Sequence, residues 1–177
     1  MTTGQIKTVV LEYAGRFPGW TIFVDGTALV RRAGPIQQMV WFQKMRSAAY
    51  RPTHGISSIV LPGAYIRMLP QILDVKHREI DYGQHQAKIV GTTVAMETQF
   101  RPDIRKTLDI SEVLSLCKDE AFGMPDTANN MTMLAILSGW LGYDDEAISY
   151  CERVVHCELP KLAPMPEWEK MMRIFSN

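Results

Sequence analysis

The chain has 177 residues, of which 46% are hydrophobic and 21% charged, and its 19 basic and 19 acidic residues give a formal net charge of zero. This composition is that of a globular protein and excludes a largely disordered chain. No apolar stretch approaches the ~18 to 20 residues of a membrane span, and the opening MTTGQIKTVVLEYAGRF does not predict a signal peptide. We therefore expect one domain over residues 1–177, located in the cytoplasm.

A helix and a hairpin are predicted at the start of the chain. Residues 5–16 place apolar side chains at helical spacing, and threonines at the preceding positions can cap the exposed amides. A run of aromatic and β-branched residues, 20–24, then comes before Asp25-Gly26, and a second run, 28–32, follows it. This pattern predicts a β-hairpin that turns at Asp25-Gly26.

Three further strands are predicted in the next part of the chain. Residues 36–45 contain an apolar run typical of a strand that is covered on both faces, which makes this segment the candidate central strand. A polar stretch, 47–53, separates it from two shorter runs, 56–61 and 65–69. The short connections favour a meander, in which each strand pairs with the one before it.

The hydrophobic period changes to that of helices in the second half. Apolar side chains recur at helical spacing over residues 81–100, and Asp109 precedes Glu112 by the three residues of a capping box, so that another helix begins after Asp109. Residues 127–141 and 144–156 predict an αα-hairpin, and 167–175 predict a last helix. The predicted fold class is therefore α+β: a mainly antiparallel meander sheet of about four or five strands, packed by helices, with a C-terminal helical hairpin as a further layer.

Charge is divided unevenly along the chain. Residues 1–106 carry 14 Lys and Arg and 7 Asp and Glu, a net charge of +7, whereas residues 107–177 carry 5 and 12, a net charge of −7. The basic α+β part and the acidic helical part could neutralise each other, or the acidic part could remain available to a basic partner. The candidate partner-binding residues on the second interpretation are Asp119, Glu120, Asp126, Asp144, Asp145 and Glu146.

The sequence contains no familiar catalytic or metal-binding motif. The four histidines are not spaced as metal ligands, the glycine-rich phosphate loops are absent, and the nucleophile elbow of serine hydrolases does not occur. Cys151, His156 and Cys157 could meet in space, but their spacing is not that of a zinc site. We therefore predict no cofactor, no metal site and no enzymatic activity.

An alternative function is that of a nucleic-acid-binding or regulatory module that uses the region 31–51. Basic side chains flank Trp41 and Phe42 there, a combination of charged and stacking groups that resembles proteins that bind single strands. The isoelectric point of about 6.9 argues against it, because a strong basic excess is expected of such proteins. The residues of this basic-aromatic region are Arg31, Arg32, Trp41, Phe42, Lys44, Arg46, Tyr50 and Arg51.

The segment GWTIFVDGTALVRRAGPIQQMVWFQKMRSAAYRP, residues 19–52, resembles small bacterial α+β domains encoded beside interbacterial toxins, and the resemblance covers about residues 5–100. It implies an immunity protein, a cytoplasmic binder that blocks a cognate toxin with its surface and has no chemistry of its own. No functional residue is carried over by the resemblance. The acidic candidates would complement a toxin with a basic surface.

Overall fold

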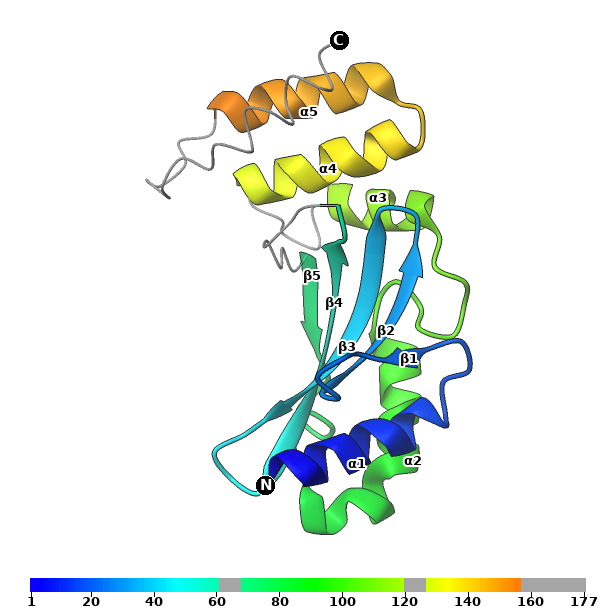
Figure 1. The fold of residues 1–177 in the computed structure, drawn as a ribbon, viewed down its shortest axis with the longest axis vertical. Helices are drawn as coiled ribbons and strands as arrows, with labels where there is room; N and C mark the ends of the chain where they lie inside the picture. The colour runs from blue at the N-terminus through cyan, green and yellow to red at the C-terminus, as the bar shows by residue number, and fades with distance from the viewer. Residues whose placement is uncertain (61–67, 120–126, 157–177) are drawn as a thin grey trace.

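An antiparallel sheet lies at the centre of the computed structural model, which describes residues 1–60, 68–119 and 127–156 (Figure 1). The strands follow one another in the order β1-β2-β3-β4-β5, and β6 pairs with β4 beyond the end of β5. This confirms the α+β class and the meander. The strands are β1 (Thr21–Ile22), β2 (Ala28–Ala33), β3 (Ile36–Lys44), β4 (Ala49–Ser58), β5 (Met68–Ile72) and β6 (Ile80–Asp81).

Three of the predicted helices begin directly after a residue whose side chain caps them. Thr2 forms a capping box with Gln5, the Asp109 carboxylate accepts from the amide of Ser111, and Thr127 caps the helix that follows it. The helices are α1 (Thr3–Ala14), α2 (His85–Gln99) after a 3-10 turn η1 (Tyr82–Gln84), α3 (Ile110–Lys118), α4 (Ala128–Trp140) and α5 (Asp144–His156). By contrast, α2 has no side-chain cap, and Asp144, the predicted cap of α5, is its first residue. The predicted helix over 167–175 lies outside the described residues. Within the described part of the chain, no helix combines the length and apolar character needed to cross a bilayer.

Two strands differ from their predicted extents. The polar stretch 47–53 belongs largely to β4, because β3 offers it a full ladder of partners and the polar side chains of Tyr50 and His54 form hydrogen bonds inside the core. β5 runs through Pro70, a residue that an edge strand tolerates since one side of its backbone needs no partner. The sequence pattern therefore missed the first half of β4, because most of its residues are polar.

The helices pack on the sheet in two groups (Figure 1). At one end of the sheet, α1 and α2 bury a cluster that includes Tyr13, Val40 and Phe100. At the other end, α3, α4 and α5 enclose a second cluster around Ile36 and Leu137. The predicted helical hairpin, α4 and α5, thus forms its own layer beyond α3.

A buried polar group separates the two clusters. Gln38 lies between Val40 and Ile36 on the same face of β3, because alternate residues of a strand share a face. Its side-chain amide accepts from Arg31 Nε and donates to His54 Nε2 at 2.8 Å. Arg31, Gln38 and His54 together form a polar layer across β2, β3 and β4.

Hydrogen bonds from the polar layer hold the segment that joins α2 to α3. Gln38 donates to the Pro102 carbonyl at 2.8 Å, and Arg31 donates to the carbonyls of Asp103, at 2.8 Å, and Lys106. The guanidinium of Arg31 also lies 5.0 Å from the ring centre of Trp20. These contacts fix the connection between the two helical groups against the sheet.

Candidate functional site

The turn between α4 and α5 presents two large aromatic side chains to solvent. Trp140, the last residue of α4, is 60% exposed, and Tyr143 is 51% exposed. Gly142 makes the turn with a φ of +78°, and the Tyr143 amide donates to the Ser138 carbonyl at 2.9 Å. Exposed aromatic side chains are enriched at protein-binding surfaces.

Three of the predicted acidic residues follow this turn directly. Asp144 and Asp145 are exposed in the first turn of α5, and neither forms an ion pair with any other described residue. Glu146 is partly buried and pairs with Lys118 at the end of α3, and the hydrogen bond from Lys118 lowers the pKa of Glu146. We call Trp140, Tyr143, Asp144 and Asp145 the acidic-aromatic turn.

The remaining acidic candidates are placed differently. Asp119 follows Lys118 at the C-terminal end of α3, so the Lys118–Glu146 pair links its segment to the start of α5. Glu120 and Asp126 lie outside the described residues. The structure therefore brings one end of α3 and the first turn of α5 together, and Asp119, Asp144 and Asp145 are the exposed carboxylates there.

Acidic residues in the first turn of a helix also have a structural role. The helix macrodipole favours negative charge near the exposed amides by about 0.3 to 1 kcal/mol for each residue. Asp144 and Asp145 are suitably placed for this effect. It does not account for the two exposed aromatic side chains beside them.

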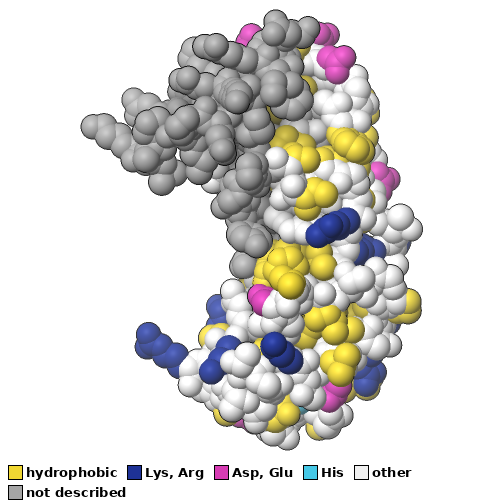
Figure 2. Space-filling model, in the orientation of Figure 1, with side chains coloured by type: hydrophobic (Ala, Val, Ile, Leu, Met, Phe, Trp, Pro, Cys, Tyr) yellow, Lys and Arg dark blue, Asp and Glu magenta, His cyan; other side chains and the backbone are white. Residues whose placement is uncertain are grey.

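Among the described residues, the ion pairs join side chains of the same charged part of the chain. Arg51–Glu79 and Arg105–Glu97 lie within residues 1–106, and Lys118–Glu146 lies within residues 107–177. Arg31 in the basic part is influenced at longer range by Glu112 in the acidic part. Figure 2 shows acidic side chains at the end of the molecule formed by α5, whereas Lys and Arg on the same face lie nearer the sheet and the other helices.

Trp140 is fixed by contact with the β2–β3 turn. Gly34 has a φ of +49°, and a Cβ added there would lie 2.7 Å from Cε2 of Trp140 and 2.8 Å from Cδ1 of Ile110. A Cβ at Gly19, which has a φ of +85°, would meet nothing within 4 Å. The close approach at Gly34 therefore connects the α4–α5 hairpin to the sheet.

Replacing Gly34 with alanine is expected to lower the free energy of unfolding by about 2 to 3 kcal/mol, because backbone strain and crowding add. Gly19→Ala carries strain without crowding, and we expect it to cost about 1 kcal/mol. Urea unfolding measures both values. The excess at Gly34 should shrink when Trp140 is also replaced with alanine, and equal costs at Gly34 and Gly19 would contradict the contact.

The basic-aromatic region of residues 31–51 does not form one exposed surface. Phe42 and Tyr50 are buried in the core beneath α1 and α2. Arg31 is held in the polar layer, and Arg51 pairs with Glu79. Arg32, Lys44 and Arg46 are exposed, and Trp41 is half-buried. This arrangement leaves few of the predicted stacking side chains accessible to a nucleic acid.

Burial and hydrogen bonding make Cys117, Cys151 and His85 poor candidates for chemistry. Burial raises the pKa of Cys117 to about 12 and also raises the pKa of Cys151, which disfavours the reactive thiolate at both. His85 is buried between the Tyr50 hydroxyl, 2.7 Å away, and the Glu12 carboxylate, 3.1 Å away. Among the described residues, no three His, Cys, Asp or Glu side chains gather as metal ligands. Cys157 and the side chain of His156 are outside that set.

The sequence patterns did not identify the acidic-aromatic turn as a unit. They identified its carboxylates by charge, but Trp140 and Tyr143 appeared as ordinary members of the hairpin. One local pattern could have indicated this surface. Trp140 lies at the end of a predicted helix, and Tyr143 directly precedes the aspartates Asp144 and Asp145. Comparison of the chain with protein families, curated proteins and solved structures found no match.

Proposed function

We propose that the chain is a non-catalytic binding protein of the immunity type, which neutralises a toxin in the cytoplasm by engaging a basic surface of that toxin. The observation that carries the proposal is the acidic-aromatic turn, where two exposed carboxylates without ion-pair partners among the described residues adjoin Trp140 and Tyr143. Carboxylates on a protein surface steer a basic partner toward it and raise the association rate. The aromatic rings then supply contact area that becomes buried in the complex.

The chemistry of the turn favours arginine-rich partners. A guanidinium can bind a carboxylate through two hydrogen bonds and stack on an indole or phenol ring at the same time. Asp144, Asp145, Trp140 and Tyr143 offer both types of group within a span of six residues along the chain. A neutral or acidic partner would use neither, so net basic charge is the property that we expect of the toxin surface.

The first experiment is affinity capture of a partner from the source organism with the tagged chain, at low and at moderate salt. One stoichiometric basic protein, identified by mass spectrometry, is the expected result. Nucleic acid that is retained at low salt and lost at higher salt would favour the alternative, in which Arg32, Lys44 and Arg46 bind a phosphate backbone.

With the partner in hand, Asp144→Lys combined with Asp145→Lys is expected to slow association about tenfold at low salt and to weaken its dependence on salt. Tyr143→Ala should instead speed dissociation, by about tenfold or more, because it removes a buried ring. Stopped-flow or surface-plasmon-resonance kinetics separate the two effects.

Two matched variants control for general changes of the surface. Glu152→Lys alters an exposed carboxylate two turns further along α5, and Leu11→Ala truncates a side chain that is 62% exposed on α1, at the far end of the molecule. Both should leave the dissociation rate unchanged. The proposed surface is wrong if the charge reversals and Tyr143→Ala affect binding no more than these controls do.

A further inference from the structure

The outer edge of β2 is covered by β1 over only part of its length. Thr21 and Ile22 of β1 lie opposite Val30 and Leu29, and the chain leaves the sheet before Thr21. On this side no strand residue of the described chain stands opposite residues 31–33. The second half of β2 is therefore an open edge.

The backbone groups of Arg32 point toward this open edge. The Ala28 carbonyl accepts from the Phe23 amide at 2.8 Å, and the Val30 carbonyl accepts from Thr21 Oγ1 at 3.1 Å, so both face β1. Alternate residues of an antiparallel strand direct their amide and carbonyl groups to the same side. The amide and carbonyl of Arg32 thus face outward, and no hydrogen bond joins them to another described residue.

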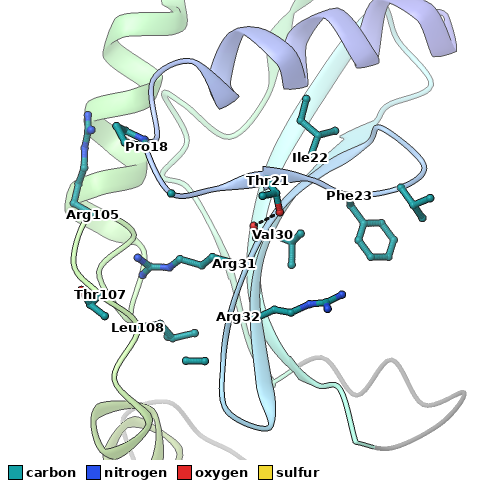
Figure 3. Close-up of a pocket in the computed structure, with 13 residues that line it drawn as sticks. Pro18, Thr21, Ile22, Phe23, Val30, Arg31, Arg32, Arg105, Thr107 and Leu108 are labelled. Carbon is teal, nitrogen blue, oxygen red and sulfur yellow. Dashed lines mark hydrogen bonds between the residues drawn. The ribbon is translucent and has the colours of Figure 1, made fainter.

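A pocket of about 810 Å³ lies along this edge (Figure 3). Residues 21–24 of the first hairpin form one wall, and Thr107 and Leu108, before α3, form another. Arg31, Arg32 and Arg105 line the pocket, and no Asp or Glu of the described residues lines it. In Figure 3, Arg31 and Arg105 lie on one side of the β2 ribbon and Arg32 lies on the other.

The three arginines are not equivalent. The guanidinium of Arg31 already donates to Gln38 and to two backbone carbonyls, and Arg105 pairs with Glu97. They contribute positive charge to the pocket but have few free donors. The Arg32 side chain is exposed and has no ion-pair or hydrogen-bond partner among the described residues. It is the group available to recognise a ligand.

We propose that the open edge of β2 binds an acidic, extended segment of another protein by strand addition. The Arg32 amide and carbonyl would exchange two hydrogen bonds with the incoming backbone, and an Asp or Glu opposite Arg32 would form a cross-strand pair with it. Ile22, which is 40% exposed, and Val24, which is 93% exposed, provide apolar contacts for neighbouring side chains.

Charge selects this occupant over a second copy of the chain. In a two-fold symmetric pairing centred on Arg32, that residue would lie opposite its own copy, and like charges directly opposite each other destabilise a strand pair. The edge is also opposite in sign to the acidic-aromatic turn. The proposal is therefore independent of the function proposed above and concerns a different partner segment.

A blocked peptide that alternates valine and glutamate, labelled with fluorescein, is the probe. Fluorescence anisotropy should show saturable binding of this peptide below about 1 mM, the weak end of specific affinities, and no binding of the matched valine-lysine peptide. Arg32→Glu is expected to weaken binding at least tenfold. Arg46→Glu, the same change at an exposed residue in the turn between β3 and β4, should leave the affinity nearly unaltered.

A separate measurement tests whether the peptide binds by strand addition. Amide hydrogen exchange followed by NMR should show that the Arg32 amide becomes protected when the valine-glutamate peptide is added, because that amide then donates to the peptide. Absence of binding below about 1 mM, equal losses in Arg32→Glu and Arg46→Glu, or protection elsewhere without protection of Arg32 would each overturn the proposal. Equal competition by an oligonucleotide would overturn it in favour of a general polyanion site.

Discussion

Replacing Arg31 with alanine is expected to lower the free energy of unfolding by about 3 kcal/mol or more, the largest effect that we foresee for a single side chain of this protein. The guanidinium donates to Gln38, Asp103 and Lys106 and lies over Trp20. Its loss would leave the Gln38 side-chain oxygen and the Asp103 carbonyl, both at least partly buried, without this donor, whereas the Lys106 carbonyl is exposed to water. Urea unfolding monitored by circular dichroism measures the change.

Two variants of neighbouring chemistry test the reason for this effect. Arg31→Lys keeps the charge but not the planar fork, so it should recover less than half of the lost stability. Arg32→Ala removes the next arginine on the same strand, whose side chain is exposed, and should change stability by no more than about 0.5 kcal/mol. The account fails if Arg31→Ala and Arg32→Ala have similar costs.

The different surroundings of Arg31 and Arg32 explain why the charge pattern of the sequence could not show which basic residues are exposed. Arg31 and Arg32 are adjacent, but strand alternation places one in the polar layer and the other in solvent. A count of basic residues treats them alike. The same limitation applies to Arg51, which pairs with Glu79 from a segment 28 residues away.

The helices were the most predictable part of the fold. A 3.6-residue period and capping residues are local signals, and α1, α4 and α5 begin within two residues of their predicted positions. The hairpin at Asp25-Gly26 is also local, since Gly26 supplies the positive φ, +74°, that the turn requires.

The features that depended on distant contacts were not predictable. β4 extends over polar residues because Gln38 and Tyr13 provide hydrogen-bond partners for His54 and Tyr50. The open edge of β2 exists because β1 ends early, which no local pattern of residues 28–33 reveals. The acidic candidates were located by charge, but their exposure and their aromatic neighbours followed only from the packing of α4, α5 and the β2–β3 turn.

The polar layer also contains a buried histidine whose bonding is incomplete. The Gln38 amide nitrogen donates to Nε2 of His54, so the proton of the neutral ring is on Nδ1, and Nδ1 is buried without a hydrogen-bond partner among the described residues. The ring stacks on Phe100 with a centroid distance of 5.1 Å. Burial, helped by the positive charge of Arg31, lowers the pKa of His54 from 6.5 to about 3.

This histidine is expected to make the protein acid-sensitive in a defined window. Below pH 6.5 the unfolded chain binds a proton at His54, whereas the folded protein does not until about pH 3. The unfolded state therefore binds more protons between these values, and stability falls by up to about 1.4 kcal/mol for each unit of decreasing pH. Above pH 6.5 this contribution is constant.

His54→Leu tests this argument through the slope of stability against pH. The variant loses the ring and an acceptor for Gln38, so its stability at pH 7 can differ from that of the parent protein in either direction. Its slope between pH 6 and pH 4, measured by urea unfolding, should nevertheless be smaller by about 1.4 kcal/mol per pH unit, because the unfolded chain no longer gains a proton at this position. An unchanged slope would mean that His54 can be protonated in the folded protein, and the polar layer would then have to open to water within that range.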